Sequence, residues 1–127
     1  MDEIIANSFF LYYTDKMEIV DINEALELVA GEKELLNELL VSYVNDRHFS
    51  LDELDSLKAE NPENAAGYVH YFKGAARQLC AKKTAFSGQI LEDILRKKSS
   101  GDYETAKRNF ASDYEELCTF IKGILNV

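Results

Sequence analysis

The sequence predicts an all-α fold: an antiparallel up-and-down four-helix bundle with one or two short N-terminal helices packed against it. Three observations lead to this prediction. Apolar residues recur at intervals of three and four, the helical period, and no segment alternates with period two as a strand does. One Pro and six Gly help to divide the chain into segments of helical length. The 127 residues suit a single domain, and no connection is long enough for a crossover between helices.

Residues 1–31 are expected to hold the short N-terminal helices. Residues 3–14 have an amphipathic pattern, and Ile22 to Ala30 has a second one that Gly31 ends. The start of the chain lacks the basic segment of a signal peptide, and the apolar run 4–13 is too short to cross a bilayer. We therefore expect a soluble protein without a membrane anchor.

Residues 32–127 are expected to form the bundle. Asn61 is a good N-cap and Pro62 a good first helical residue, so a helix begins there, and Asp102 can cap the last helix. Connections of only a few residues make consecutive helices antiparallel neighbours. The four expected helices cover about residues 32–60, 62–79, 82–98 and 102–125.

Composition excludes some classes of function. A net charge of −9 argues against a nucleic-acid-binding protein, which needs Lys and Arg for phosphate contacts. Two cysteines without a secretory context suggest reduced thiols and a cytoplasmic protein. The stretch 64–91 has no Asp or Glu but contains Lys73, Arg77, Lys82 and Lys83. This stretch either binds a small anion or an acidic partner, or is an ordinary solvated helix face.

A helical projection of residues 62–79 places His70 away from the apolar side of the helix. Two glycines lie on the same side, and each costs about 1 kcal/mol relative to Ala in a helix interior. Their presence suggests that something large approaches the imidazole closely, although an ordinary surface histidine remains the alternative. The residues within about 60° of His70 in this projection are Ala66, Gly67, Lys73, Gly74 and Arg77.

The surroundings of His70 in the sequence limit its chemistry. No His, Cys, Asp or Glu follows His70 at the helical spacing that a metal site needs, and the only other histidine is His48. Cys80 lies ten residues on, too far along the helix for a Cys–His dyad. No cofactor-binding motif is present, and a convex helix face offers no substrate pocket. The chemistry that is not excluded is nucleophilic attack by a neutral imidazole on a phosphoryl group that another protein delivers. Lys73 and Arg77 would offset the negative charge of that group.

The segment His70-Tyr-Phe-Lys73-Gly74-Ala75-Ala76, followed by Leu79-Cys-Ala81 and Leu91-Glu92, resembles the pattern of histidine-containing phosphotransfer (HPt) domains. The resemblance spans roughly residues 18–125. It implies a four-helix bundle that shuttles phosphoryl groups between the receiver domains of two-component phosphorelays. It also implies that His70 is phosphorylated at Nε2, that Lys73 supports the phosphoryl group, and that Gly74 gives the partner access. Glu92 matches an acid that accepts a hydrogen bond from the active histidine in some members.

The resemblance further implies partners and a cellular setting. The partners would be receiver domains of response regulators or of hybrid histidine kinases, with Mg²⁺ on the receiver and no cofactor or metal on this chain. The chain would be a cytoplasmic, monomeric carrier and not an enzyme by itself.

Three positions depart from the HPt pattern. Cys80 stands where the family usually has Gly, so the turn there is expected to differ. Thr84 and Gly88 replace the usual core residues of the next helix and are expected to loosen its packing.

Two other functions stay open at this level. The chain could be an interaction adaptor that keeps the bundle without phosphotransfer and docks helices on Tyr12, Tyr13 or Tyr71. A small helical enzyme is the less favoured alternative, because no constellation of residues indicates a substrate pocket.

Overall fold

The computed structural model describes residues 19–125, and in this part of the chain all regular structure is helical. The all-α prediction is confirmed there, whereas the helix expected over residues 3–14 lies outside the described residues. In chain order the helices are α2 (Ile22–Leu28), α3 (Lys33–Asn45), α4 (Leu51–Glu60), α5 (Pro62–Gln78), α6 (Lys82–Leu95) and α7 (Tyr103–Leu125).

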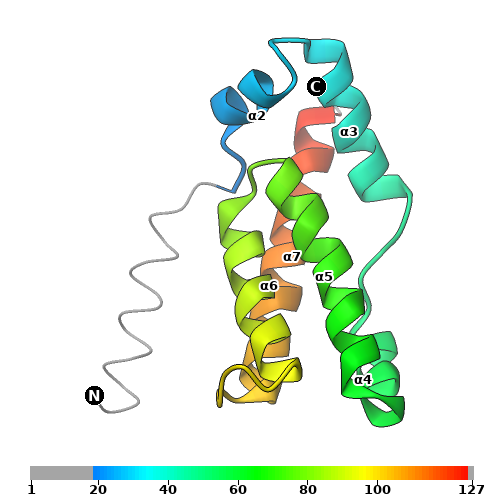
Figure 1. The fold of residues 1–127 in the computed structure, drawn as a ribbon. Helices are drawn as coiled ribbons and strands as arrows, with labels where there is room; N and C mark the ends of the chain where they lie inside the picture. The colour runs from blue at the N-terminus through cyan, green and yellow to red at the C-terminus, as the bar shows by residue number, and fades with distance from the viewer. Residues whose placement is uncertain (1–18, 126–127) are drawn as a thin grey trace.

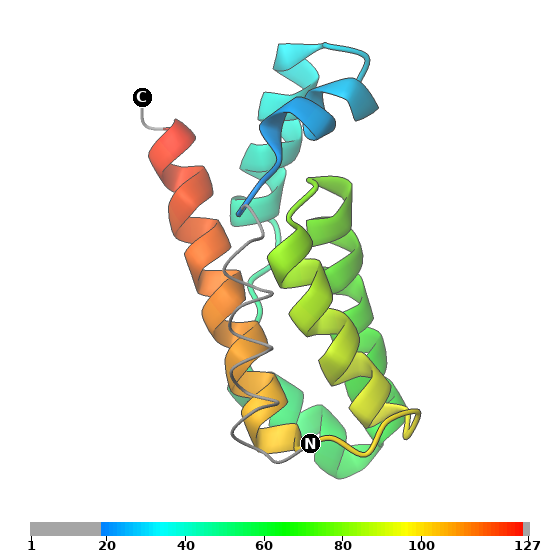
Figure 2. The ribbon, with the colours of Figure 1, turned by 90° about the vertical axis from the view of Figure 1, so that its left-hand side faces the viewer.

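Three long helices form the centre of the molecule. α5 packs against α6, and α6 packs against α7, so the three lie side by side (Figures 1 and 2). α3 packs on α7 at one end of the molecule, with α2 beside it, and α4 packs on α5 at the other end. None of the helices in residues 19–125 is both long enough and apolar enough to cross a bilayer.

The prediction of one long helix over residues 32–60 is wrong. Residues 46–50 separate α3 from α4, and Ser50 is extended, with its hydroxyl accepting a hydrogen bond from the Glu53 amide at 3.3 Å. Phe49 is buried in this break and its ring contacts Tyr68, Phe72, Phe110 and Tyr114. The Phe49 amide also donates to the Tyr114 hydroxyl at 3.3 Å. Burial of this aromatic ring outweighs the helical period of the segment.

Two predicted helix starts are confirmed. The Asn61 side chain accepts from the Glu63 amide at 3.0 Å at the start of α5, with Pro62 as the first residue of the helix. The Asp102 side chain likewise accepts from the Thr105 amide at 3.0 Å at the start of α7. Short polar side chains therefore fix these two boundaries.

Two predicted helix ends lie too far along the chain. α2 ends at Leu28, because Ala30 already has a left-handed backbone with φ of 55°. α6 ends at Leu95 for the same reason, since φ of Lys97 is 61°. Neither Ala nor Lys signals this conformation in a sequence, because glycine is its usual occupant.

Cys80 does not change the turn after α5, contrary to expectation. Its φ is 58°, and the Cys80 and Ala81 amides donate to the carbonyls of Arg77 and Ala76 at 3.0 Å and 2.9 Å. This pair of hydrogen bonds is the Schellman motif that glycine usually closes. The turn therefore forms despite the strain of a side chain in the left-handed region.

Thr84 and Gly88 do not loosen α6, which corrects the second expectation. Thr84 is buried, and its hydroxyl donates to the Asp113 carbonyl at 3.3 Å. A Cβ at Gly88 would lie 3.0 Å from both Lys73 Cβ and Phe110 Cε1. Glycine at this position therefore lets α5 and α7 approach α6 closely.

Candidate functional site

His70 projects from α5 into solvent, and 61% of its side chain is exposed. The opposite side of α5 buries Tyr68, Val69 and Phe72 in the core. The helical period of these apolar residues is what turns the imidazole outward, as the sequence predicts.

Glu92 of α6 holds one nitrogen of the imidazole. His70 Nδ1 lies 3.2 Å from Glu92 Oε1 and 3.3 Å from Oε2, and the carboxylate is 8% exposed. An ionised carboxylate only accepts hydrogen bonds, so Nδ1 must carry the proton. In the neutral imidazole this leaves Nε2 without a proton, with its lone pair available to a partner.

Two cations hold the same carboxylate. Lys73 Nζ lies 2.8 Å from Glu92 Oε1, and Arg96 Nε lies 3.0 Å from Oε2. Burial by itself raises the pKa of Glu92, but the hydrogen bonds from Lys73, Arg96 and His70 outweigh burial, and the pKa falls below its ordinary value. Glu92 is therefore ionised at neutral pH and acts as an acceptor.

Lys73 and Ala66 are not on the exposed face where the helical projection places them. Ala66 is fully buried, and the Lys73 side chain is 5% exposed, with Nζ also donating to Gln89 Oε1 at 2.9 Å. The reason is that α5 is covered on two sides, by α4 and by α6. An idealised projection of one helix contains no information about which edges its neighbours cover.

The other residues that the projection groups with His70 remain accessible. Gly67 is exposed and Gly74 is half-buried, and a Cβ at either position would meet no atom within 4 Å. Arg77 is exposed, and no carboxylate of residues 19–125 lies within ion-pair distance of it. The face around His70 is therefore open at both glycines.

Most of the positive stretch 64–91 is compensated by carboxylates from elsewhere. Besides the pair of Lys73 with Glu92, Lys82 pairs with Glu24 at 2.8 Å. Lys83 pairs with Glu116 at 3.1 Å. The strong positive field suggested by the sequence is thereby reduced.

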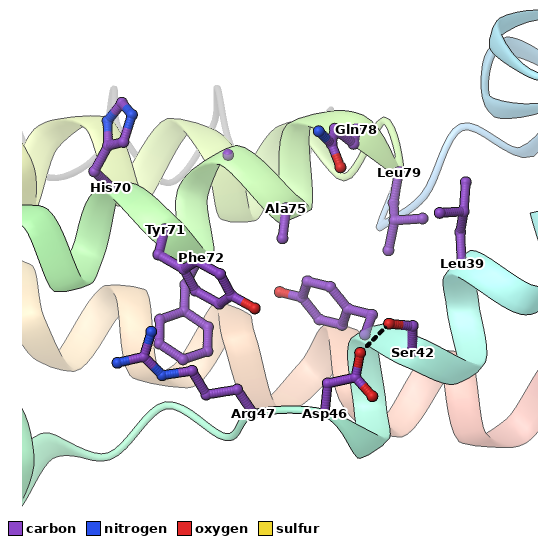
Figure 3. A pocket seen from close by; sticks show the side chains of 12 residues that line it. Leu39, Ser42, Asp46, Arg47, His70, Tyr71, Phe72, Ala75, Gln78 and Leu79 are labelled. Atoms are coloured by element: carbon purple, nitrogen blue, oxygen red, sulfur yellow. Dashed lines mark hydrogen bonds between the residues drawn. The ribbon is translucent and has the colours of Figure 1, made fainter.

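A groove of about 350 Å³ runs between α3 and α5 beside His70 (Figure 3). The convex helix face expected from the sequence is therefore hollowed on one side. The Tyr43 hydroxyl, from a residue that lines the groove, is buried without a hydrogen-bond partner among the described residues. The residues that line the groove are Leu39, Ser42, Tyr43, Asp46, Arg47, His70, Tyr71, Phe72, Gly74, Ala75, Gln78 and Leu79.

Arg47 brings a second exposed cation to this region. Its guanidinium carbon lies 4.8 Å from the ring centre of Tyr71 and 5.6 Å from that of Phe72. Tyr71 and Phe72 lie between Arg47 and His70 (Figure 3). Such stacking holds the guanidinium in place while leaving its donors available.

Sequence reasoning missed both Arg47 and Arg96. Arg96 carried a usable signal, because it follows Glu92 by four residues on one helix, the spacing of side-chain ion pairs. Arg47 carried none, because it lies in a connection whose path the core decides.

His48 has partners that no pattern in the sequence indicates. Its Nε2 lies 3.0 Å from Glu115 Oε1, and its Nδ1 lies 3.4 Å from the Tyr114 hydroxyl. The His48 side chain is 58% exposed and that of Glu115 is 60% exposed. Both nitrogens of His48 therefore face protein groups, whereas only Nδ1 of His70 does among the described residues.

Comparison with protein-family models, with curated proteins and with solved structures gives no significant match. Residues 19–125 also contain no group of three or more His, Cys, Asp and Glu side chains placed to hold a metal ion.

Proposed function

We propose that this chain is a phosphoryl carrier of the HPt type, which accepts a phosphoryl group on His70 and passes it to another protein. The donor is the aspartyl phosphate of a receiver domain, or a histidine kinase, and the acceptor is the aspartate of a second receiver. The observation that carries the proposal is the geometry of His70: Nδ1 faces the buried carboxylate of Glu92, and the ring is largely exposed.

The transfer step follows from this geometry. The lone pair of His70 Nε2 attacks the phosphorus, an N–P bond forms, and the P–O bond to the donor aspartate breaks, releasing its carboxylate. The ring keeps its proton on Nδ1 and so becomes positively charged as the N–P bond forms. The negative charge of Glu92, at 3.2 Å, stabilises this developing charge. Attack by the carboxylate of the next receiver reverses the step.

The surroundings of His70 support the approach of a protein partner. Gly67 and Gly74 leave room on both sides of the imidazole. Arg77 and Arg47 offer exposed cations to acidic side chains of the partner. The burial of Lys73 against Glu92 supports a role in holding this carboxylate, in addition to any contact with the phosphoryl group.

We propose the antiparallel four-helix bundle as the corresponding fold. α5, α6 and α7 provide three of its helices, and α3 and α4 together take the fourth position. The packing of α4 on α5 and of α3 on α7 supports this arrangement.

Site-specific labelling tests the function. The protein is incubated with phosphorylated receiver domains, or with phosphoramidate as a small donor, and the modified residue is located by mass spectrometry. We expect acid-labile, alkali-stable phosphate on His70 in the wild type and in His48→Gln, and none in His70→Gln. Equal labelling of His70→Gln and the wild type would refute the proposal.

An interaction adaptor without phosphotransfer is the second candidate. The groove beside His70, with the half-exposed Tyr71 in its lining, favours it, because a groove can bind a partner helix without chemistry. Tyr12 and Tyr13 lie outside the described residues. Receiver domains that bind the protein without labelling it would support the adaptor.

A further inference from the structure

Arg96 lies where it can control how Glu92 faces His70. Arg96 is the C-cap residue, directly after the last residue of α6, and it connects two carboxylates: Nε lies 3.0 Å from Glu92 Oε2, and Nη1 lies 2.7 Å from Glu63 Oε2. Glu63 belongs to the first turn of α5, two turns before His70. Arg96 therefore links the helix that carries the histidine to the helix that carries its acceptor.

The distances around Glu92 show which contacts orient the carboxylate. His70 Nδ1 is almost equally far from the two oxygens, at 3.2 Å and 3.3 Å, which is a shared and long hydrogen bond. Lys73 and Arg96 are closer, at 2.8 Å and 3.0 Å, and each takes a different oxygen. Short bonds between two charged groups are stronger than a long bond from a neutral ring, so the two cations fix the carboxylate and the imidazole adjusts to it.

The two cations differ in what anchors them. Lys73 is buried and is also held by Gln89 Oε1 at 2.9 Å. Arg96 is 26% exposed, and its second anchor, Glu63, is 62% exposed. A surface pair such as Arg96–Glu63 contributes little to stability by itself. The contribution of Arg96 is therefore expected in the geometry of Glu92 more than in the stability of the fold.

We propose that Arg96 is a positioning residue: it holds Glu92 in the orientation that keeps the His70 proton on Nδ1 and leaves Nε2 free. The proposal adds to the proposed function the residue that sets the tautomer of the nucleophile. Its importance for transfer rests on that function, but the tautomer itself can be measured without any partner.

The test is the tautomer of each histidine, measured from the nitrogen chemical shifts of the imidazoles in ¹⁵N-labelled protein at mildly alkaline pH. We expect His70 in the wild type to be mainly the Nδ1–H form. In Arg96→Gln we expect the ratio of Nδ1–H to Nε2–H to fall about fivefold, which corresponds to weakening a charge-assisted hydrogen bond by about 1 kcal/mol. Arg96→Lys should recover part of the ratio, because it restores the charge without the fork geometry.

Three controls separate positioning from general stability. Arg108→Ala removes an arginine that is 74% exposed and pairs with Glu104 on its own helix, so it should leave the His70 ratio unchanged. His48, which faces Glu115 instead, should keep its tautomer in every variant and reports on unrelated changes. Glu63→Gln removes only the outer anchor and should lower the ratio less than Arg96→Gln, which gives a second measurement if that variant folds poorly.

The outcomes are distinct. An unchanged His70 tautomer in folded Arg96→Gln, or in Arg96→Lys and Glu63→Gln if the first does not fold, would overturn the proposal. A changed tautomer in a protein that no receiver domain or phosphoramidate labels would uphold the positioning role and refute the proposed function. A changed tautomer together with slower labelling of His70 at saturating phosphoramidate supports both.

Discussion

Alanine at Gly88 should destabilise the protein, whereas alanine at Gly67 or Gly74 should stabilise it, and this difference tests the close packing of α6. A Cβ at Gly88 would lie 3.0 Å from Lys73 Cβ and from Phe110 Cε1. Both side chains are buried; Lys73 Cβ is bonded to the backbone, and Phe110 Cε1 belongs to a rigid ring, so neither atom can move aside easily. Alanine there gains about 1 kcal/mol of helix propensity but forces neighbouring helices apart, which costs about 1–3 kcal/mol. We expect Gly88→Ala to lower the free energy of unfolding by about 1 kcal/mol.

Gly67→Ala and Gly74→Ala are the matched controls. A Cβ at either site meets nothing within 4 Å, so only the propensity gain remains, and each variant should be more stable by about 0.5–1 kcal/mol. Urea unfolding followed by circular dichroism measures all three values. A Gly88→Ala protein as stable as the Gly67→Ala protein would refute the inference that glycine is needed for the close approach of α5 and α7 to α6.

Two further substitutions probe buried charge. Lys73→Met removes a cation from the buried carboxylate of Glu92. It should lower the free energy of unfolding, measured in urea, by about 3 kcal/mol, the lower end of the cost of breaking a buried pair. A loss below about 1 kcal/mol would show that Arg96 alone compensates the charge of Glu92. Burial is the main reason why the pKa of Asp113 is raised, with Glu116 adding to it, so its charged form destabilises the fold as the pH rises through that pKa. Asp113→Asn should therefore melt at a higher temperature than the wild type at neutral pH, and this advantage should shrink as the pH falls; an advantage that is equal at all pH values would contradict this explanation.

The fold class and most helix boundaries followed from local chemistry. The three- and four-residue spacing of apolar residues predicted helices, and Asn61 and Asp102 marked two helix starts because a capping side chain acts within its own turn. The break before α4 was also encoded locally, because Ser50 and Glu53 have the spacing of a capping box. The local pattern does not show whether this capping signal is stronger than the helical period of the apolar residues around it. The burial of Phe49 among rings from α5 and α7 favours the break over a continuous helix.

For the candidate site, too, one part followed from the sequence and another part depended on the tertiary structure. The sequence by itself determined that His70 faces outward, because the apolar residues of its own helix fix that direction. Only the tertiary structure decided that Lys73 is buried against Glu92, that Arg96 shares this carboxylate, and that Arg47 stacks beside a groove. The physical reason is that a helix sets the angle at which a side chain leaves it, whereas the neighbouring helices decide whether that angle leads to solvent or to another side chain.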